Sequence, residues 1–264
     1  RINWILLISI CIAFSICSVY LISNKTPWVD ETYSWYGINH ESFDEFASSI
    51  TSGINYSPPL YFFINWIGQL FLSLTLDDLR FESLVFIIGG SYLIYCMLLK
   101  LLGPIPALLG AGGILLQSDL LLEQSTEARQ YGLFFFCGAA VLFAGKNLLT
   151  DNRKRTTWVW AFIANLALCL THYLGIIFSG LAGLSRFWAM GFDRKKAIKS
   201  SPEIASWIVS IVVYAFLIKS QTSHLNTWNK ANGLGNLISS YLGTFNPLFF
   251  FDSYCSNHLP EFKK

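Results

Sequence analysis

Two adjacent carboxylates, Asp30 and Glu31, stand in a segment rich in aromatic residues, Pro27-Trp28-Val29-Asp30-Glu31-Thr32-Tyr33-Ser34-Trp35-Tyr36. Apolar surroundings raise the pKa of a carboxyl group and make it a stronger proton acceptor, whereas a nearby cation has the opposite effect. The pair could therefore supply a general base. The same residues also fit a structural interpretation, in which Asp30 caps a helix that begins at Glu31 and the aromatic side chains form an interfacial belt.

A second candidate is Arg129, in the motif Glu127-Ala128-Arg129-Gln130-Tyr131 next to a long apolar run. A guanidinium group is always charged and its forked donors match a phosphate group. Arg129 could therefore bind a lipid-linked phosphate. The alternative is that Arg129 extends toward water or pairs with Glu127 or Glu123.

Two further motifs carry polar side chains. His172, in Thr171-His172-Tyr173, can donate and accept a hydrogen bond, although a single histidine is more often a packing residue. In Asn55-Tyr56-Ser57-Pro58-Pro59-Leu60-Tyr61-Phe62, two prolines favour an extended entry and the start of a helix. This amphipathic segment could anchor the chain at a membrane surface and also form one wall of a cleft for a lipid chain.

The elements that position these residues follow from the composition. Of 264 residues, 53% are apolar and 13% are charged, about half the charged fraction of soluble domains, which is roughly 25%. The uncharged residues come in long blocks, which indicates a membrane protein. The net charge of +2 is too small to predict a nucleic-acid partner. The six cysteines have no CxxC spacing and are typical of small buried apolar residues.

Several uncharged runs have the length of a membrane-crossing helix, since about 20 residues at about 1.5 Å each match a hydrocarbon core of about 30 Å. The uncharged run 156–185 is too long for a single crossing, but its continuation through residue 190 has room for two short helices. We therefore expect a helical hairpin that turns near Thr171-His172-Tyr173. The expected spans are 2–24, 83–99, 101–118, 131–145, the two arms of the hairpin, and 204–218.

The uncharged segment 60–76 decides the topology. If it crossed the membrane, Lys100 and the basic clusters at 153–155 and 194–199 would face outward, against the preference of Lys and Arg for the cytoplasmic side. If it lies in the interface, seven spans bring all three basic sites to the inside. We therefore expect 60–76 to be interfacial.

This topology gathers the acidic residues on the outer face, together with Arg80, Arg129 and His172. Ionisable groups near membrane depth are costly unless they are paired or hydrated, so they are functional candidates. The acidic residues are Asp30, Glu31, Glu41, Asp44 and Glu45 in the first outer loop, Asp77, Asp78 and Glu82 before the second span, and Glu123 and Glu127 after the third.

The order of these motifs resembles that of the GT-C membrane glycosyltransferases. An apolar N-terminal span precedes Asp30-Glu31-Thr32-Tyr33, a helical stretch at 41–50, Pro58-Pro59-Leu60-Tyr61, Leu79-Arg80-Phe81, the Arg129 motif and the His172 motif. The chain is most similar to the bacterial group that is related to protein O-mannosyltransferases and includes the aminoarabinose transferase of lipid A.

The resemblance implies an all-α, polytopic GT-C-like bundle of about seven transmembrane helices, with interfacial juxtamembrane helices in the first outer loop. We expect this transmembrane domain at 1–220, a catalytic first outer loop at 23–82 and an interfacial helix near 58–76. Residues 221–264 are then an outer loop that leads to a further C-terminal part. The location expected for such a protein is a bacterial inner membrane, with the active site facing outward.

The resemblance also implies an inverting enzyme that moves a sugar from a polyprenyl-phosphate donor to a lipid, glycan or protein acceptor. Asp30 is the expected base, and Glu31 would orient or substitute for it. Arg129, and after it Arg80, would bind the donor phosphate. Expected substrate-binding residues are Tyr33, Tyr61, Glu127, Tyr131 and His172. No metal site is assigned, although a divalent cation could bind carboxylates beside a phosphate.

Two other classes stay open: a transporter or flippase of lipid-linked sugars, and a non-catalytic membrane scaffold. Transporters often have inverted repeats with broken helices at the membrane midplane. The charges of this chain lie instead at the outer ends of the expected spans. Replacement of Asp30 by Asn distinguishes the classes, because only a transferase should lose turnover.

Overall fold

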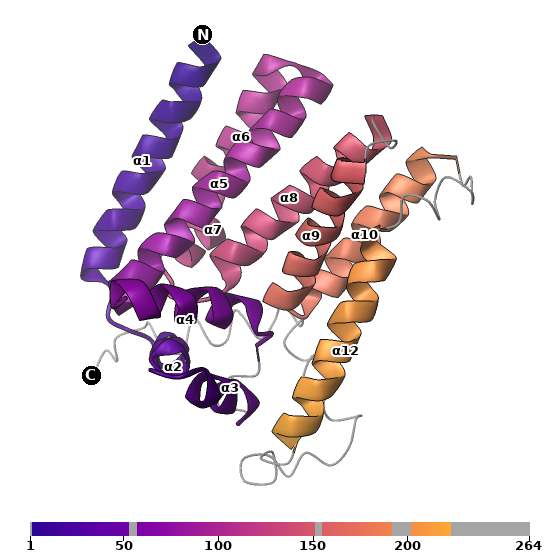
Figure 1. Cartoon of the computed structure of the whole chain (residues 1–264). Coiled ribbons are helices and arrows are strands. Elements are labelled where there is room, and N and C mark those ends of the chain that lie inside the picture. The colour runs from indigo at the N-terminus through magenta and orange to yellow at the C-terminus, as the bar shows by residue number, and fades with distance from the viewer. Residues whose placement is uncertain (1, 53–56, 151–154, 192–201, 223–264) are drawn as a thin grey trace, which may run out of the picture. The chain divides into compact units, whose positions relative to one another are not determined.

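The computed structural model describes residues 2–52, 57–150, 155–191 and 202–222, and all regular secondary structure in these ranges is helical (Figure 1). The helices belong to one compact unit, Arg1–Gln221. The outer loop expected over 221–264 lies outside the described residues, apart from the two residues that end the last helix. The all-α class is therefore confirmed for the described part of the chain.

Four of the described helices are long and apolar enough to cross a membrane. They are α1 (Ile2–Asn24), α5 (Leu76–Leu102), α8 (Tyr131–Thr150) and α12 (Pro202–Thr222). Their apolar stretches are 19 to 27 residues long, which matches the length that a hydrocarbon core requires. These helices fit an integral membrane protein, as the composition predicts.

Three shorter helices fill the remaining expected spans: α6 (Pro104–Gln117), α9 (Arg155–Thr171) and α10 (Leu174–Ala189). The helix α6 packs against α1 and α5, whereas α9 and α10 pack against α8 and each other. The predicted break near Thr171 is confirmed, because α9 ends there and α10 begins three residues later. With 14 to 17 residues each, these helices are shorter than a standard crossing, so the seven-span topology stays a prediction.

Short helices gather at one end of the long ones, as Figure 1 shows for α2 (Val29–Ile38), α3 (Phe43–Thr51) and α4 (Leu60–Leu72). The helix α4 runs across the ends of its neighbours and has 13 residues, about 20 Å of helix. The helix α4 is shorter than a standard crossing, as α6 is, but α4 also lies across the ends of the long helices, which agrees with the expectation that this segment is not a span.

Aromatic side chains join these short helices. The ring of Phe46 on α3 stacks on Trp66 of α4 with centroids 4.9 Å apart. Trp66 donates its indole N–H to the carbonyl of His40 at 3.1 Å, and Trp35 on α2 donates to the carbonyl of Leu74 at 3.3 Å. Both indole N–H groups therefore have a polar partner, and α2, α3 and α4 form one connected layer.

The helix α5 begins earlier than the sequence predicts. The expected span starts at residue 83, whereas the helix starts at Leu76, so Asp77, Asp78 and Glu82 belong to the helix and do not precede it. A capping box explains the start: Thr75 accepts from the backbone N–H of Asp78 at 3.3 Å, and the Asp78 carboxylate accepts from that of Thr75 at 2.8 Å. Charged residues in the first turns therefore do not prevent the helix.

At each end of the long helices, residues that are far apart in the sequence contact each other. At the end that carries α2 to α4, Ser18 of α1 hydrogen-bonds to Ser125, between α7 (Asp119–Gln124) and α8, at 2.8 Å. At the other end, the ammonium group of Lys100 lies 5.7 Å from the centre of the Phe143 ring. The basic Lys100 and the acidic first turn of α2 therefore lie at opposite ends of the long helix α5, as the sequence predicts.

Candidate functional site

The first feature of the candidate site is a buried ion pair between Glu31 of α2 and Arg80 of α5. Arg80 donates from Nε to one carboxylate oxygen at 3.0 Å and from Nη2 to the other at 2.8 Å. Both side chains are almost fully buried, with exposures of 2% for Arg80 and 0% for Glu31. Such a two-bond pairing fixes both the distance and the orientation of the two groups.

Further hydrogen bonds complete both partners. Glu31 also accepts from the backbone N–H of Trp28 at 3.0 Å and of Ala128 at 2.8 Å. Arg80 also donates to the carbonyl of Lys25 at 3.1 Å and to Asp77 at 3.2 Å. These bonds join the end of α1, α2, α5 and the segment before α8. We call the Glu31–Arg80 pair with these partners the clamp.

The electrostatics of the clamp favour a permanently charged Glu31. Burial alone would raise the pKa of this carboxyl group, but the hydrogen bonds from Arg80, Trp28 and Ala128 lower it below its ordinary value. A carboxylate in this state is a weak proton acceptor, and its oxygens already have four donors. The clamp therefore has the properties of a framework for the site.

The sequence interpretation of Asp30 as a helix cap is wrong. The helix α2 begins at Val29, with Trp28 before it, so both carboxylates lie in the first turn. The carboxylate that accepts from the backbone of Trp28 belongs to Glu31. Asp30 is therefore not needed to satisfy the start of the helix, and its carboxylate points elsewhere.

Asp30 meets Arg129 at the surface beside the clamp. One Asp30 oxygen lies 3.3 Å from Nη1 of Arg129, and the side chains are 55% and 26% exposed. The backbone N–H of Ala128 donates to Glu31. This contact brings Asp30, the residue before Glu31, close to Arg129, the residue after Ala128. Both groups of this pair can be reached from solvent, unlike those of the clamp.

Arg129 is held by the segment that carries it. The hydroxyl group of Ser83 on α5 donates to the carbonyl of Glu127 at 2.6 Å and lies 3.3 Å from that of Arg129. The guanidinium carbon of Arg129 lies 4.8 Å from the centre of the Tyr131 ring, a cation–π distance. At Gly132, an added Cβ would lie 2.7 Å from the carbonyl oxygen of Ser83. The start of α8 and α5 therefore approach as closely as a glycine allows.

Glu127 lies beside the same segment and is 6% exposed. It pairs with Lys25 at 3.4 Å, and its second oxygen is buried without a hydrogen bond to any described residue. Burial raises the pKa of this carboxyl group, and the charges of Lys25 and Arg129 offset part of that effect. Lys25 had not been predicted from the sequence as a site residue, because it carries no signal beyond following a span.

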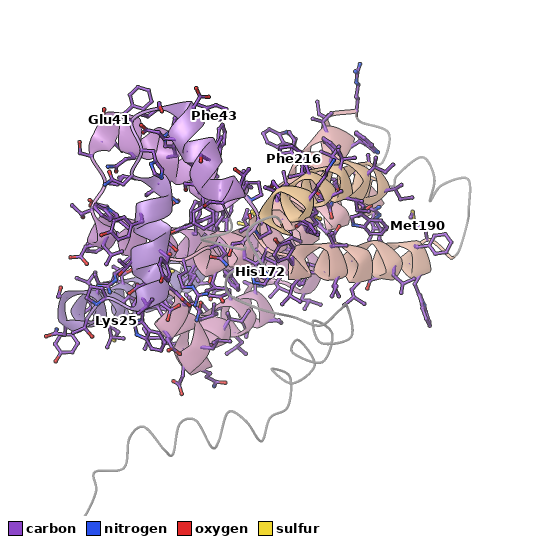
Figure 2. All side chains as sticks on the ribbon, turned by 90° about the horizontal axis from the view of Figure 1, so that it is seen from below. Lys25, Glu41, Phe43, His172, Met190 and Phe216 are labelled. Atoms are coloured by element: carbon purple, nitrogen blue, oxygen red, sulfur yellow. The ribbon has the colours of Figure 1, made fainter. Side chains whose placement is uncertain are left out.

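His172 lies at the corner between α9 and α10. Its ring centre is 5.8 Å from that of Tyr131 and 5.1 Å from that of Phe134. Burial and the charge of Arg129 lower its pKa. Its Nδ1 accepts from the backbone N–H of Leu174 at 3.1 Å, so the neutral ring carries its proton on Nε2. Figure 2 views this end of the helices and labels His172 and Lys25.

The two predicted tyrosines lie in different environments. Tyr61 on α4 is 1% exposed, and its hydroxyl group has no hydrogen bond to any described residue. Burial raises its pKa well above the ordinary value, as do the negative charges of Glu82 and Glu31, while Arg129 acts in the opposite direction. Tyr33 is 43% exposed on α2.

The site therefore collects most of the predicted residues from separate parts of the chain. The contacts above link the clamp, the Asp30–Arg129 pair and the groups around them. Tyr33 is placed near them only because it lies on α2, the helix of Asp30. Among the residues that the structure describes, no three or more His, Cys, Asp or Glu side chains are grouped to hold a metal ion.

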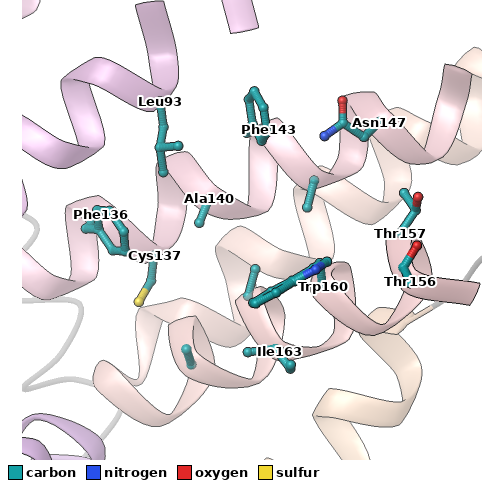
Figure 3. A pocket seen from close by; sticks show the side chains of 13 residues that line it. Leu93, Phe136, Cys137, Ala140, Phe143, Asn147, Thr156, Thr157, Trp160 and Ile163 are labelled. Carbon is teal, nitrogen blue, oxygen red and sulfur yellow. The ribbon is translucent and has the colours of Figure 1, made fainter. Parts of the chain in front are cut away.

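A separate cavity of about 580 Å³ lies between α5, α8 and α9. Asn147, Thr156 and Thr157 line the part near the α8–α9 connection, and apolar side chains including Phe136 and Trp160 line much of the remainder (Figure 3). Its size and apolar walls are those of a small-molecule or lipid-chain site. No residue of α4 lines this cavity, so it is not the cleft that the sequence predicts beside α4.

Comparison of the chain with protein-family models, curated proteins and solved structures finds no match.

Proposed function

We propose that the chain carries the donor site of an inverting glycosyltransferase, which moves a sugar from a polyprenyl-phosphate carrier to an acceptor at the membrane surface. The observation that carries this proposal is the accessible Asp30–Arg129 pair beside a buried, fully bonded clamp. One group can accept a proton and the other can bind a phosphate, and both belong to motifs that resemble those of the GT-C glycosyltransferases.

In the proposed reaction, the oxygen of an acceptor hydroxyl group attacks the anomeric carbon of the donor sugar. The bond between this carbon and the phosphate oxygen breaks, and polyprenyl phosphate leaves with the electron pair. Asp30 takes the proton of the acceptor. Arg129 stabilises the charge that develops on the phosphate, which needs a cation and no general acid.

The contact between Asp30 and Arg129 gives the donor a way to activate the base. Asp30 lies 3.3 Å from Arg129, so its carboxylate is occupied by an ion pair. A bound phosphate competes for the same guanidinium group and separates the two partners. Asp30 then becomes available to the acceptor when the donor is bound.

The clamp leads us to propose different roles for Glu31 and Arg80 from those suggested by the resemblance. A phosphate-binding arginine needs donors that can reach the ligand, but Arg80 is 2% exposed and bonded to Glu31, Asp77 and backbone carbonyls. Glu31 has four donors already. We assign both to positioning of Asp30 and Arg129.

The remaining predicted residues keep their proposed contacts with substrate. Tyr131 lies against Arg129 and His172 lies beside Tyr131, while Glu127, which pairs with Lys25, is within the electrostatic reach of Arg129. Tyr33 is exposed on the helix of Asp30. The proposed setting is the outer face of a bacterial inner membrane, with a lipid, glycan or protein acceptor.

The apolar cavity supports a lipid ligand of some kind. It lies among the apolar helices, and one end, at Ala167, is one helical turn from Thr171 and the His172 corner. A flippase of lipid-linked sugars would also need apolar walls and a phosphate-binding arginine, so it remains the second candidate. The two functions differ in their need for Asp30, because only the glycosyltransferase uses it as a base.

The test is sugar transfer in proteoliposomes that contain the protein. Labelled polyprenyl-phosphate sugars are offered to the wild type and to Asp30→Asn. A general base contributes about 100-fold or more to the rate, so the variant should lose at least this factor. The matched control is Asp44→Asn, an exposed first-turn aspartate on α3, which should transfer at the wild-type rate.

Equal transfer by the wild type and Asp30→Asn would remove Asp30 as the base. Donor movement across the membrane without transfer, unchanged in Asp30→Asn, would favour the flippase. A wild type that neither transfers nor moves any donor would favour the scaffold.

A further inference from the structure

The cavity of about 580 Å³ between α5, α8 and α9 is not used by the reaction proposed above. Its lining on α8 extends from Phe136 to Asn147, and its lining on α9 extends from Thr156 to Ala167. Each of these stretches is about 16 Å of helix, and α8 and α9 pack against each other. The cavity is therefore elongated along the two helices.

The two ends of the cavity differ in polarity. Asn147, Thr156 and Thr157 line the end that lies at the start of α9 (Figure 3). The other side chains that line the cavity are apolar, as far as Cys137 and Ala167. Such a cavity suits a ligand that has a polar group at one end and a hydrocarbon chain at the other.

The polar end of the cavity also has a positive environment. The ammonium group of Lys100 lies 5.7 Å from the ring centre of Phe143, which lines the cavity. Arg155 is the first residue of α9 and is exposed. Glu203, the acidic residue at this end in the described part of the chain, already pairs with Arg186 at 2.5 Å. The polar group of the ligand should therefore be an anion.

The length and the side walls of the cavity match one leaflet of a membrane. A hydrocarbon core of about 30 Å gives each leaflet about 15 Å, close to the length of the cavity. Trp160 and Ile163 line the cavity and are 67% and 45% exposed. These walls therefore also belong to the surface that the helices present to the bilayer, from which a lipid chain can enter.

The carrier lipid of the proposed donor suits this cavity less well. Its phosphate would bind Arg129, which lies just before the start of α8, whereas Asn147 lies near the end of α8. The carrier chain would have to enter at the Ala167 end and finish beside Asn147 and Thr156. Hydrocarbon would then cover polar side chains, which is unfavourable. A lipid with its head group at the Lys100 end places each of its parts against matching walls.

We propose that this cavity binds one acyl chain of an anionic phospholipid from the leaflet at the Lys100 end, with the lipid phosphate near Lys100 and Arg155. The basic residues predict that this end is cytoplasmic, and the cytoplasmic leaflet carries a negative surface potential from anionic lipids. The site does not depend on the proposed transferase, because it uses no residue of the clamp and neither Asp30 nor Arg129.

The experiment measures contact with lipid, not turnover. The protein is placed in phosphatidylcholine nanodiscs that contain a small fraction of phosphatidylglycerol with a photoreactive diazirine on one acyl chain. After illumination, peptide mass spectrometry compares the label on 136–147 with the label on α12, whose exposed apolar residues also face the bilayer. Phosphatidylcholine with the same photoreactive chain is the probe without net charge. Unlabelled phosphatidylglycerol and unlabelled polyprenyl phosphate are the competitors.

The first variant fills the cavity. Ala140 lines its middle, so Ala140→Phe places a ring in the space of the acyl chain. The ring displaces at least two methylene groups, each of which contributes about 4-fold to binding when buried. We therefore expect the label on 136–147 to fall by about 10-fold or more. The matched control, Ala215→Phe, adds the same ring at an exposed position of α12 and should keep the wild-type label.

The second set of variants leaves the packing of the helices unchanged and therefore tests the site even if Ala140→Phe does not fold. Lys100→Gln and Arg155→Gln each remove one exposed cation. A cation near an anionic lipid contributes about 5-fold to the attraction. Each variant should lose about this factor for phosphatidylglycerol and nothing for phosphatidylcholine. The control is Lys219→Gln, an exposed lysine in the last turn of α12, which should label as the wild type does.

Stronger labelling of 136–147 by phosphatidylglycerol than by phosphatidylcholine, reduced in the variants as described, would support the site. Equal labelling by the two lipids, or unchanged labelling in both Lys100→Gln and Arg155→Gln, would overturn it. Displacement by polyprenyl phosphate at a lower concentration than by phosphatidylglycerol would assign the cavity to the carrier and also overturn it. None of these outcomes requires sugar transfer, so failure of this site and failure of the proposed transferase are seen separately.

Discussion

Replacement of Glu31 by Gln should destabilise the fold through Arg80. Glutamine has nearly the shape of glutamate but carries one acceptor oxygen and an NH₂ group. Whichever oxygen it replaced, that NH₂ group would face one N–H of the Arg80 guanidinium and one backbone N–H, that of Ala128 at Oε1 or that of Trp28 at Oε2, and all of these are donors. Arg80 would then be a buried cation that has lost its buried counter-charge and keeps only its ion pair with the exposed Asp77.

The structure sets the size of this effect. Loss of one partner from a buried ion pair costs about 3–5 kcal/mol. Arg80 would keep its contacts with Asp77, Lys25 and Ile22, so we expect the lower limit, about 3 kcal/mol. The control is Glu45→Gln on α3, an exposed glutamate, for which the expected change lies within about 0.5 kcal/mol.

The assay is equilibrium or thermal unfolding of the purified chain in one detergent at one lipid content. A double-mutant cycle with Arg80→Met isolates the coupling, because the double variant has no unpaired charge and should be more stable than either single variant. A loss below about 1 kcal/mol in Glu31→Gln, or simple additivity in the double variant, would refute the clamp as a coupled framework.

Three other predictions follow from the same end of the molecule and from its opposite end. Gly132→Ala should destabilise the fold by about 1–3 kcal/mol, because its Cβ would contact the backbone of Ser83, and thermal unfolding measures this loss. Because the pKa of His172 is lowered in the folded state, the unfolded chain takes up its proton first. Stability should therefore fall as the pH decreases below about 6.5, and unfolding curves of His172→Gln should lack that component. In a cysteine-free chain, single cysteines at 78 and 100 should react with an impermeant reagent from opposite sides of the membrane, and reaction of both from one side would contradict α5 as a span.

The breaks between helices could be predicted because their signals are local. The long run that begins at residue 156 had to turn, and Thr171-His172-Tyr173 places three consecutive residues with polar groups near its middle; α9 ends and α10 begins there. The paired prolines before α4 likewise mark the start of a helix. Such signals depend on a few neighbouring residues, so one sequence contains them in full.

The start of α5 was missed because hydropathy treats charge as the end of a span. The buried counter-charge that makes Arg80 compatible with a buried helix is Glu31, which is 49 residues away. The residues that neighbour Arg80 in the sequence do not indicate that its partner is Glu31. For the same reason, the alternatives considered for Arg129 included Glu127 and Glu123 but not Asp30, with which it pairs.

The clamp also explains how adjacent carboxylates can take separate roles. Successive residues of a helix point about 100° apart, so Glu31 can turn inward to Arg80 and the backbone of Ala128 while Asp30 turns outward. The hydrogen bond from Ala128 to Glu31 then places the side chain of Arg129 within contact distance of Asp30. One buried contact between α2 and the segment before α8 therefore aligns two accessible groups that are far apart in the sequence. The sequence identifies the residues that could do chemistry, but their pairing depends on this long-range contact.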